Sequence, residues 1–207
     1  EELRAAHGID VIVIAADVRR MAQVDGIFRA LRGKRIDVLI NNAGLARGKA
    51  SLEDAAWEDI EDMVETNVKG FVRVAQLAVP FLKETTGHVV NVSSIAGVEA
   101  YPGGGVYCGT KAFVKMLSKA MRMDLLGTGI RVTDIAPGAV ETDFSHVRFH
   151  GDHGKAKAVY AGYMPLNAKD IAACVLFALS QPQHVNVEYL LVTPTAQASV
   201  HLVDRKG

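Results

Sequence analysis

The sequence predicts an α/β fold built on a doubly wound parallel sheet, in which helices cover both faces of the sheet. Short apolar runs of strand type alternate with segments of helical periodicity along the chain, as in strands that are joined by crossover helices. The strand-type runs are almost continuously apolar, which is typical of parallel strands buried on both faces. Because no repeat, low-complexity segment or linker interrupts the alternation, we predict a single domain over residues 1–207.

The first part of the chain is expected to hold two helices and two strands. The opening residues are typical of the end of a helix that closes near Gly8, and the apolar run Val11–Ala15 predicts a strand. Residues 20–33 carry apolar side chains at helical spacing. The run Asp37–Asn41 then predicts a strand that is buried on both faces.

The middle of the chain is expected to hold the longest helix and a central strand. Helical periodicity extends over about 54–83, and this helix is expected to break or bend near Gly70 and Pro80. The run His88–Val92 predicts the next strand. A loop follows, and then a helix that ends near Gly127.

The last part of the chain completes the alternation. Arg131–Ile135 predicts a strand that is closed by Pro137-Gly138. Residues 139–165 are expected to be irregular or to form short helices. A helix over 168–180 and a final strand over 187–193 follow.

Composition limits the possible function classes. Lys and Arg together number 23 and so do Asp and Glu, and the scattered cations argue against a nucleic-acid-binding surface. No apolar run approaches the roughly 18 residues of a membrane-spanning helix. The cysteines, Cys108 and Cys174, lie far apart, which is typical of free thiols in a reducing compartment. We therefore expect a cytoplasmic protein with neither nucleic-acid nor membrane partners.

A tyrosine and a lysine in the helix that ends near Gly127 give the strongest chemical signal. Tyr107 and Lys111 are four residues apart and therefore lie on one face of that helix. The ammonium group is expected to stabilise a phenolate and to lower the pKa of the tyrosine from about 10. Beside the hydroxyl of Ser94, thirteen residues upstream, such a phenol can exchange a proton with a carbonyl or alcohol oxygen near neutral pH.

Together with Asn41-Asn42-Ala43-Gly44, which ends a predicted strand, these residues resemble the classical short-chain dehydrogenase/reductase family in identity and order. The resemblance covers essentially the whole chain. It implies a Rossmann-like sheet, a nicotinamide dinucleotide cofactor and hydride transfer to or from a small molecule. It also implies four catalytic residues, Asn67, Ser94, Tyr107 and Lys111. Two of these residues also have non-catalytic alternatives. Ser94 can be a loop residue whose hydroxyl bonds only to backbone, and Asn67 can be a polar residue that the helix merely tolerates.

Cofactor contacts are implied for residues that follow the predicted strands, where open α/β sheets place their ligands. By resemblance the cofactor-binding residues are Asp17, Val18, Asn41, Ala43, Gly44, Tyr107, Lys111, Pro137, Gly138, Val140 and Thr142. The residues alone leave two alternatives open. Asn41 to Gly44 is also a common turn composition, and Asp17 is also a suitable helix cap.

The glycine-rich turn that holds the pyrophosphate in such domains is missing from the pattern. The glycine clusters, Gly103-Gly104-Gly105 and Gly127 with Gly129, neither follow a hydrophobic strand nor are expected to open a helix. The chain also begins with Glu1 rather than methionine. We therefore expect the sequence to be N-terminally incomplete, lacking a first strand-helix-strand unit of roughly 40 residues.

The segment from Asp143 to Asp152 resembles the substrate loop of a narrower group, the NADP-dependent 3-hydroxy acid dehydrogenases, which oxidise serine and 3-hydroxypropionate or reduce malonic semialdehyde. The resemblance implies NADP as cofactor, with NAD as the alternative. An acid substrate requires a cation, and Arg148 can bind a carboxylate through two hydrogen bonds. Ser94 and Tyr107 complete the expected substrate site. The alternative for Arg148 is an exposed loop arginine.

Other functions fit the same fold. They are reduction of an uncharged ketone or a 3-ketoacyl thioester, for which Arg148 is not needed, and dinucleotide binding without catalysis. A metal site is suggested by three histidines and an aspartate close together in the sequence, His146, His150, Asp152 and His153. The neighbouring glycines disfavour the regular helix that such a site needs, and the resembled family uses no catalytic metal. We therefore expect no bound metal. The resemblance also implies a homotetramer that takes a small-molecule substrate.

Overall fold

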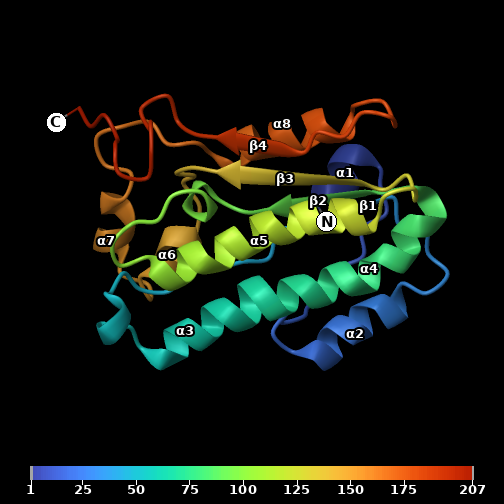
Figure 1. Ribbon diagram of the computed structural model, residues 1–207, viewed down its shortest axis with the longest axis horizontal. Helices are drawn as coiled ribbons and strands as arrows, with labels where there is room; N and C mark the ends of the chain where they lie inside the picture. The colour runs from blue at the N-terminus through green and yellow to red at the C-terminus, as the bar shows by residue number, and fades with distance from the viewer. Residues whose placement is uncertain (1, 207) are drawn as a thin grey trace.

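Four parallel strands form the central layer in a computed structural model that describes residues 2–206 (Figure 1). In sheet order they are β1 (Val38–Asn41), β2 (His88–Val92), β3 (Arg131–Pro137) and β4 (Tyr189–Val192). Each strand is parallel to its neighbour. The predicted α/β class with a parallel sheet is confirmed.

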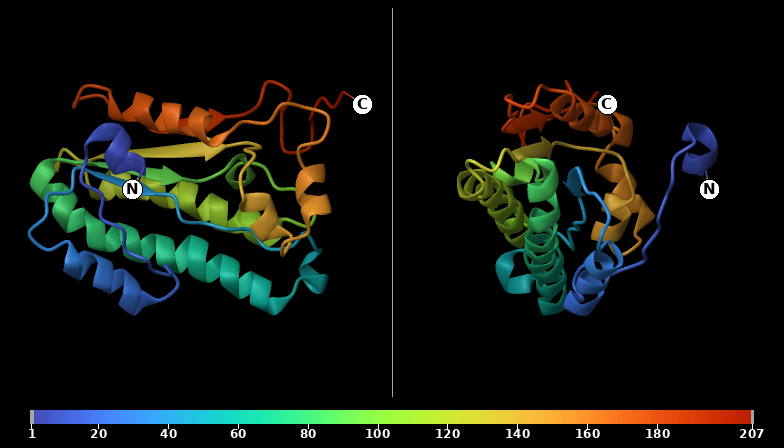
Figure 2. Two further views of the ribbon diagram at one scale, coloured as in Figure 1. Left: turned by 180° about the vertical axis from the view of Figure 1, so that it is seen from behind. Right: turned by 90° about the vertical axis from the view of Figure 1, so that its right-hand side faces the viewer.

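Helices cover both faces of this sheet, as the doubly wound class requires (Figure 2). The two fully buried neighbours Val89 and Val90 point to opposite faces, because side chains alternate along a strand. Val89 packs against α2 (Met21–Ala30), α4 (Phe71–Thr85) and α5 (Gly105–Asp124). Val90 packs against α8 (Ala168–Leu179).

The expected long helix over 54–83 consists of three consecutive segments. These are α3 (Trp57–Val64), the π-helical η2 (Glu65–Gly70) and α4, preceded by the short 3₁₀ turn η1 (Leu52–Asp54). The helix type changes at Gly70, but the backbone stays helical there, so the expected break is not seen. A Cβ added to Gly70 would lie 2.8 Å from the carbonyl oxygen of Val18. Pro80 lies inside α4 and does not break it.

The remaining helices are short and lie at the ends of the longer elements. They are α1 (Glu2–His7), η3 (Ile95–Gly97), α6 (Phe144–Arg148) and α7 (His153–Ala158). The helix α1 ends at Gly8 with a φ of +62°, as predicted. One expectation is wrong: Gly104 is the N-cap of α5, so this glycine cluster does open a helix. Its lack of a side chain leaves room for the ring of Tyr101.

The predicted strand Val11–Ala15 is not a strand. This segment joins no ladder with other described residues, and Ile12 and Val13 are 63% and 86% exposed. A strand exists only through hydrogen bonds to a neighbour, and the segment runs outside the layers (Figure 2). The strand β1 likewise is not buried on both faces, because Val38 and Ile40, whose side chains share one face, are 38% and 51% exposed.

Candidate active site

A cavity of about 1250 Å³ lies at the carboxyl ends of the strands. Ser94 reaches it from the end of β2, Tyr107 and Lys111 from α5, Gly44 from the segment after β1, and Pro137 from the end of β3. The fold thereby brings together residues that are far apart in the sequence. This is the edge where open parallel sheets bind their ligands.

Tyr107 lies in the first turn of α5 and is 7% exposed. Its ring packs against Phe144, with ring centroids 5.6 Å apart. Burial raises the pKa of the Tyr107 phenol, and the Ser94 hydroxyl and the charge of Arg148 oppose this rise. The expected net fall of this pKa below about 10 is therefore wrong for the site as described, since desolvation of the phenol dominates.

Lys111 is also buried, with 6% of its surface exposed. Its Nζ donates a hydrogen bond of 2.9 Å to the carbonyl oxygen of Val92. Burial lowers the pKa of Lys111 to about 8, and the negative charge of Asp134 opposes this shift. The ammonium form therefore still predominates at pH 7.

Ser94 combines a capping role with a position in the cavity. Its Oγ accepts a hydrogen bond of 3.1 Å from the Ala96 N–H at the start of η3 and donates one of 3.4 Å to the carbonyl oxygen of Pro137. The backbone-bonding alternative thus holds at this residue, alongside its contact with the cavity. Ser93 also lines the cavity, but it is the Ser94 hydroxyl that affects the pKa of Tyr107.

Asn67 lies in the π-helical segment η2 and is 1% exposed. Its amide nitrogen donates to the Leu45 carbonyl oxygen at 2.7 Å and to Thr110 Oγ1 at 3.0 Å, and its Oδ1 accepts from the Leu45 N–H at 2.9 Å. A Cβ added to Gly44 would lie 3.3 Å from both Asn67 Oδ1 and Lys111 Nζ. Asn67 thus joins the segment after β1 to α5, close to the lysine, and π-helical turns are frequent at functional sites.

The predicted cofactor-binding residues fall into two sets. Those that line the cavity are Gly44, Tyr107, Lys111, Pro137, Gly138, Val140 and Thr142. Of the described residues, Asp17, Val18, Asn41 and Ala43 do not line it. The Asn41 amide instead donates to the Phe71 carbonyl oxygen, and the N-cap of α2 is Arg20 rather than Asp17.

Several lining residues were not found from the sequence. Asn42, rather than Asn41, faces the cavity, and Tyr101 and Gln197 also line it. Gln197 Oε1 accepts a hydrogen bond from the Ala139 N–H, 58 positions away in the chain. The Tyr-Pro-Gly turn at Tyr101 is the one signal that was available, since it immediately precedes the helix of Tyr107.

Positive charge gathers around the cavity. Within residues 2–206, its lining contains one carboxylate, Asp143, and the five cations Lys49, Lys111, Arg148, Lys155 and Arg205. Walls with an excess of one charge attract ligands of the opposite sign. The cavity therefore suits an anionic ligand.

Arg148 is half-buried at the end of α6, beside the candidate catalytic tyrosine. Its Nε donates a hydrogen bond of 3.0 Å to the Gly48 carbonyl oxygen, and its guanidinium carbon lies 5.3 Å from the ring centroid of Tyr101 and 5.8 Å from that of Tyr107. Within residues 2–206 no carboxylate forms an ion pair with Arg148. It also lines a second cavity of about 290 Å³, so it lies in the wall between the two. Its charge is available to a ligand in either cavity.

The histidines near Arg148 have other contacts. His150 Nε2 lies 3.2 Å from a carboxylate oxygen of Asp59, and the rings of His146 and His153 meet edge-on with centroids 4.7 Å apart. In the described part of the chain, no group of three or more His, Cys, Asp or Glu side chains is arranged to hold a metal ion. Nor does any helix within residues 2–206 combine the length and apolar composition needed to cross a membrane.

Comparison with known proteins places these features in context. The model of the short chain dehydrogenase family matches residues 1–152. The NADP-dependent 3-hydroxy acid dehydrogenase of Schizosaccharomyces pombe is 40% identical over 209 residues, which cover 100% of this chain and 81% of that protein. Sulfoacetaldehyde reductase 2 of Chromohalobacter salexigens is 44% identical over 210 residues, which cover 99% and 82%. A closed form of serine dehydrogenase complexed with NADP⁺ superposes with a TM-score of 0.91 at 40% identity, over 100% of this chain and 85% of that one.

Proposed function

The chain belongs to the short-chain dehydrogenase family, and we propose that it transfers a hydride between NADP(H) and a small 3-hydroxy acid or its semialdehyde. The observation that carries this proposal is the convergence of Ser94, Tyr107, Lys111 and Arg148 on one cavity. The first three supply the acid–base group, and the fourth supplies a cation for an acid substrate. Residues 1–207 then belong to a single dinucleotide-binding oxidoreductase domain that is N-terminally incomplete.

Tyr107 is the proton donor in the reductive direction. Because burial raises its pKa, the phenol is protonated at neutral pH and can give its proton to a carbonyl oxygen. Ser94 hydrogen-bonds the same oxygen, and its 3.4 Å bond to the Pro137 carbonyl oxygen is long enough to be exchanged for it. In the oxidative direction the phenol must lose its proton, and the nearby ammonium group of Lys111 favours that loss.

The residues present fit the nicotinamide end of NADP, while the glycine-rich turn that holds the pyrophosphate in such domains is not among them. The cavity is large, cationic and lined by small residues after β1 and β3, where a backbone can approach a ligand closely. Lys111 would hold the hydroxyls of the nicotinamide ribose, while Val140 and Thr142 would contact the carboxamide. When bound, the nicotinamide supplies the hydride in reduction and accepts it in oxidation. Asn67 completes a proton relay through water beside Lys111.

Arg148 selects for an anionic substrate. Its guanidinium group lies beside the Tyr107 ring and is free of ion pairs within the described residues. A planar guanidinium can bind a carboxylate or a sulfonate through paired hydrogen bonds. Relatives named for a 3-hydroxy acid and for sulfoacetaldehyde both support an acidic substrate. A sulfonated aldehyde is accordingly the second candidate substrate.

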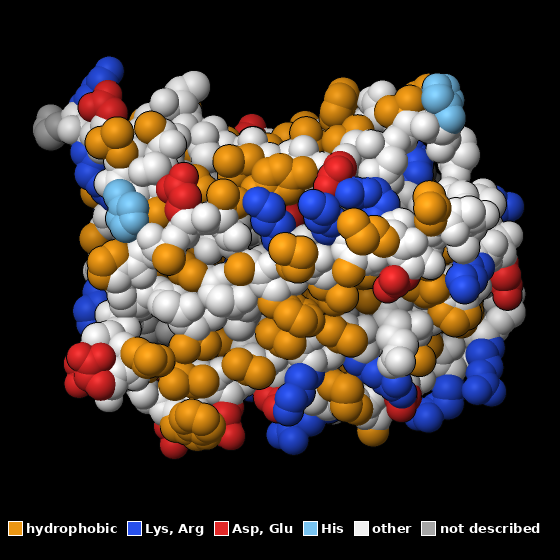
Figure 3. All heavy atoms as spheres, in the orientation of Figure 1, with side chains coloured by type: hydrophobic (Ala, Val, Ile, Leu, Met, Phe, Trp, Pro, Cys, Tyr) orange, Lys and Arg blue, Asp and Glu red, His pale blue; other side chains and the backbone are white. Residues whose placement is uncertain are grey.

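The protein is proposed to act as a cytoplasmic homotetramer. Apolar side chains gather over α4 and α5 on the face shown in Figure 3. Phe113, Met116 and Met123 of α5 are 36%, 67% and 64% exposed. Exposed apolar patches of this kind mark protein interfaces. The free thiols of Cys108 and Cys174 suit a reducing compartment. Light scattering of the purified protein should give a mass four times that of one chain, and a monomer mass would contradict the tetramer.

The catalytic assignment is tested by Tyr107→Phe. We expect this variant to lose at least about 10³-fold in the initial rate of NADP⁺ reduction with 3-hydroxypropionate, because the proton-transfer group is removed. NADPH binding, followed by the change in its fluorescence, should stay within about threefold of the wild-type affinity. A variant that retains a rate near that of the wild type would contradict the assignment.

A further inference from the structure

A buried carboxylate lies behind the candidate catalytic lysine. Asp134, on β3, is 2% exposed, and its Oδ1 accepts a hydrogen bond of 3.2 Å from the Ser93 N–H. Its Oδ2 has no hydrogen-bond partner among the described residues. No cation within residues 2–206 lies close enough to form an ion pair with it. Such a group is costly to bury, so its presence requires a reason.

The neighbours of Asp134 across the sheet share this lack of partners. In the strand register, Asp134 lies directly between Asn91 on β2 and Tyr189 on β4. Among the described residues, Asn91 Oδ1 and Tyr189 Oη are also buried without a hydrogen-bond partner. Three adjacent polar side chains with unpartnered atoms on one face of a sheet indicate a position for bound water.

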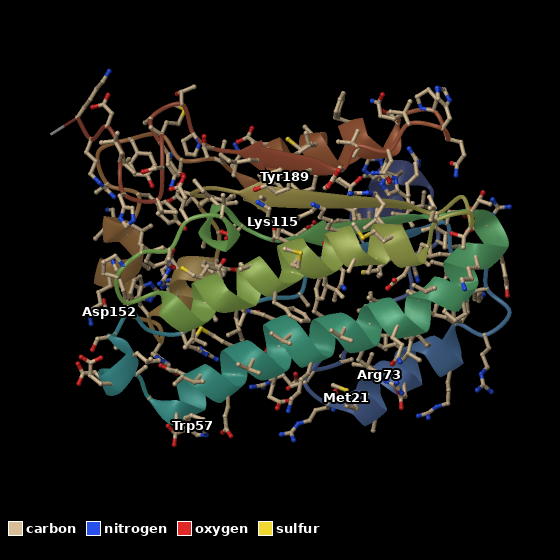
Figure 4. All side chains as sticks on the ribbon, in the orientation of Figure 1. Met21, Trp57, Arg73, Lys115, Asp152 and Tyr189 are labelled. Atoms are coloured by element: carbon tan, nitrogen blue, oxygen red, sulfur yellow. The ribbon has the colours of Figure 1, made fainter. Side chains whose placement is uncertain are left out.

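The face that carries these three side chains is covered by α5. The Asn91 amide donates to Ser118 on that helix, and Lys115 Nζ lies 4.6 Å from the ring centroid of Tyr189 (Figure 4). Lys111 is one turn before Lys115. The titratable groups that face Asp134 are therefore these two lysines and Tyr189, because Asn91 and the other β2 neighbour, Ser93, do not titrate.

Lys111 and Asp134 bind the two ends of one peptide group: the Val92 carbonyl oxygen accepts a hydrogen bond of 2.9 Å from Lys111 Nζ, and the Ser93 N–H donates one of 3.2 Å to Asp134 Oδ1. The charges of these two side chains are therefore coupled. Burial raises the pKa of Asp134, while the hydrogen bonds from Ser93 and the charges of Lys111 and Lys115 oppose that rise. In turn, burial lowers the pKa of Lys111, and the charge of Asp134 opposes that fall. The cavity in front of Lys111 supplies little of this negative charge, because the charged residues of its lining are cations apart from Asp143. A desolvated lysine without such a neighbouring negative charge loses its proton more readily.

We propose that Asp134 is a positioning residue that keeps Lys111 charged, through its carboxylate and through water held between it, Asn91 and Tyr189. The inference rests on the proposed function, in which the charged lysine binds the ribose and assists Tyr107. Asp134 itself touches neither substrate nor cofactor. It supplies the buried negative charge from behind the active site.

The direct test follows the protonation of Lys111 by NMR in protein labelled with ¹³C-lysine, with the resonance assigned by its loss in Lys111→Arg. In the wild type the midpoint should lie near pH 8. In Asp134→Asn, whose amide oxygen still accepts from the Ser93 N–H, the protonation constant should fall about tenfold. Asp134→Glu, which keeps the negative charge, should restore most of the lost protonation constant of Lys111. An unchanged midpoint in Asp134→Asn would overturn the proposal.

Two further measurements keep the test decisive. Lys115→Gln, the matched control on the same helix, should not lower the Lys111 midpoint, and a fall as large as in Asp134→Asn would contradict the role of Asp134. If Asp134→Asn does not fold, Lys111→Met should shift the Asp134 carboxyl titration to higher pH, and no shift would overturn the coupling. Because these titrations require no turnover, they remain informative if the protein is inactive on every 3-hydroxy acid.

The activity readout connects the coupling to catalysis. The pH dependence of kcat/KM in Asp134→Asn should lose its alkaline side at lower pH than in the wild type, while the two rates converge near pH 6. A purely structural defect would lower the rate equally at every pH, which would contradict the positioning role.

Discussion

Replacing Arg148 by glutamine tests the substrate class most sharply. Glutamine keeps a donor that can reach the Gly48 carbonyl oxygen, which Arg148 Nε contacts at 3.0 Å, but it removes the charge beside Tyr107. Hydrogen bonds to charged groups contribute about 1.5–3 kcal/mol. The loss on an acid substrate is therefore expected to be roughly 10- to 150-fold in kcat/KM. An uncharged secondary alcohol makes no such bond and should lose less than about threefold.

The assay compares initial rates of NADP⁺ reduction on 3-hydroxypropionate and on the alcohol, and the ratio of the two kcat/KM values is the readout. Arg205→Gln is the matched control, because Arg205 lines the same cavity while its guanidinium bonds to the Ala161 and Val159 carbonyl oxygens. It should leave the ratio unchanged, since the guanidinium nitrogens of Arg205 are already bonded to these backbone carbonyl oxygens. Arg148→Lys should recover part of the rate but not the paired geometry. Equal losses on both substrates in Arg148→Gln would refute an acid-binding role.

Three further predictions concern stability. Gly97→Ala should lower the free energy of unfolding, measured by urea titration, by about 1–3 kcal/mol and reduce activity, since the added Cβ would lie 2.6 Å from a carbonyl oxygen of α5. Gly109→Ala, inside α5, should instead raise the free energy of unfolding by about 0.5–1 kcal/mol. Leu82→Ala, at a fully buried site, should lower the free energy of unfolding by about 2–5 kcal/mol. Leu126→Ala, at an 86% exposed site, should lower it by less than about 0.5 kcal/mol. Equal urea midpoints of the two variants would contradict the assigned core. Burial lowers the pKa of His88 in the folded protein to about 4. As the pH falls, this histidine is therefore protonated in the unfolded chain before it is protonated in the folded one, and the free energy of unfolding should fall by up to about 3 kcal/mol from pH 6.5 to pH 4. His88→Gln should remove that part of the pH dependence, and an unchanged slope would disprove its origin.

The convergence of Ser94, Tyr107 and Lys111 on one cavity was accessible from the sequence because its geometry is largely local. Helical spacing alone places Tyr107 and Lys111 on one face, and both are buried residues of α5. Ser94 follows directly from a strand whose apolar run is easily read, and it lies at the same cavity. The alternation of strands and helices likewise depends on local patterns, so the α/β class and the positions of most elements were predicted.

The features that sequence reasoning missed depend on distant parts of the chain. The run Val11–Ala15 has strand composition, but a strand also needs a neighbour, which no local pattern specifies. The pKa of Tyr107 was predicted in the wrong direction because its burial comes from residues such as Phe144. Gln197 entered the cavity lining through a contact 58 residues away. The surroundings of Asp134 likewise appear only when three strands and α5 are seen together.

The measurement that tests the central claim most directly is the initial rate of NADP⁺ reduction by the wild-type protein on a panel of alcohols. The panel contains 3-hydroxypropionate, serine, the hydroxy sulfonate formed by reduction of sulfoacetaldehyde, and an uncharged secondary alcohol. We predict that activity is confined to the anionic or zwitterionic acids and is greater with NADP⁺ than with NAD⁺. Activity on the uncharged alcohol alone would contradict the proposed substrate class, and no activity on any of them would contradict the proposed function.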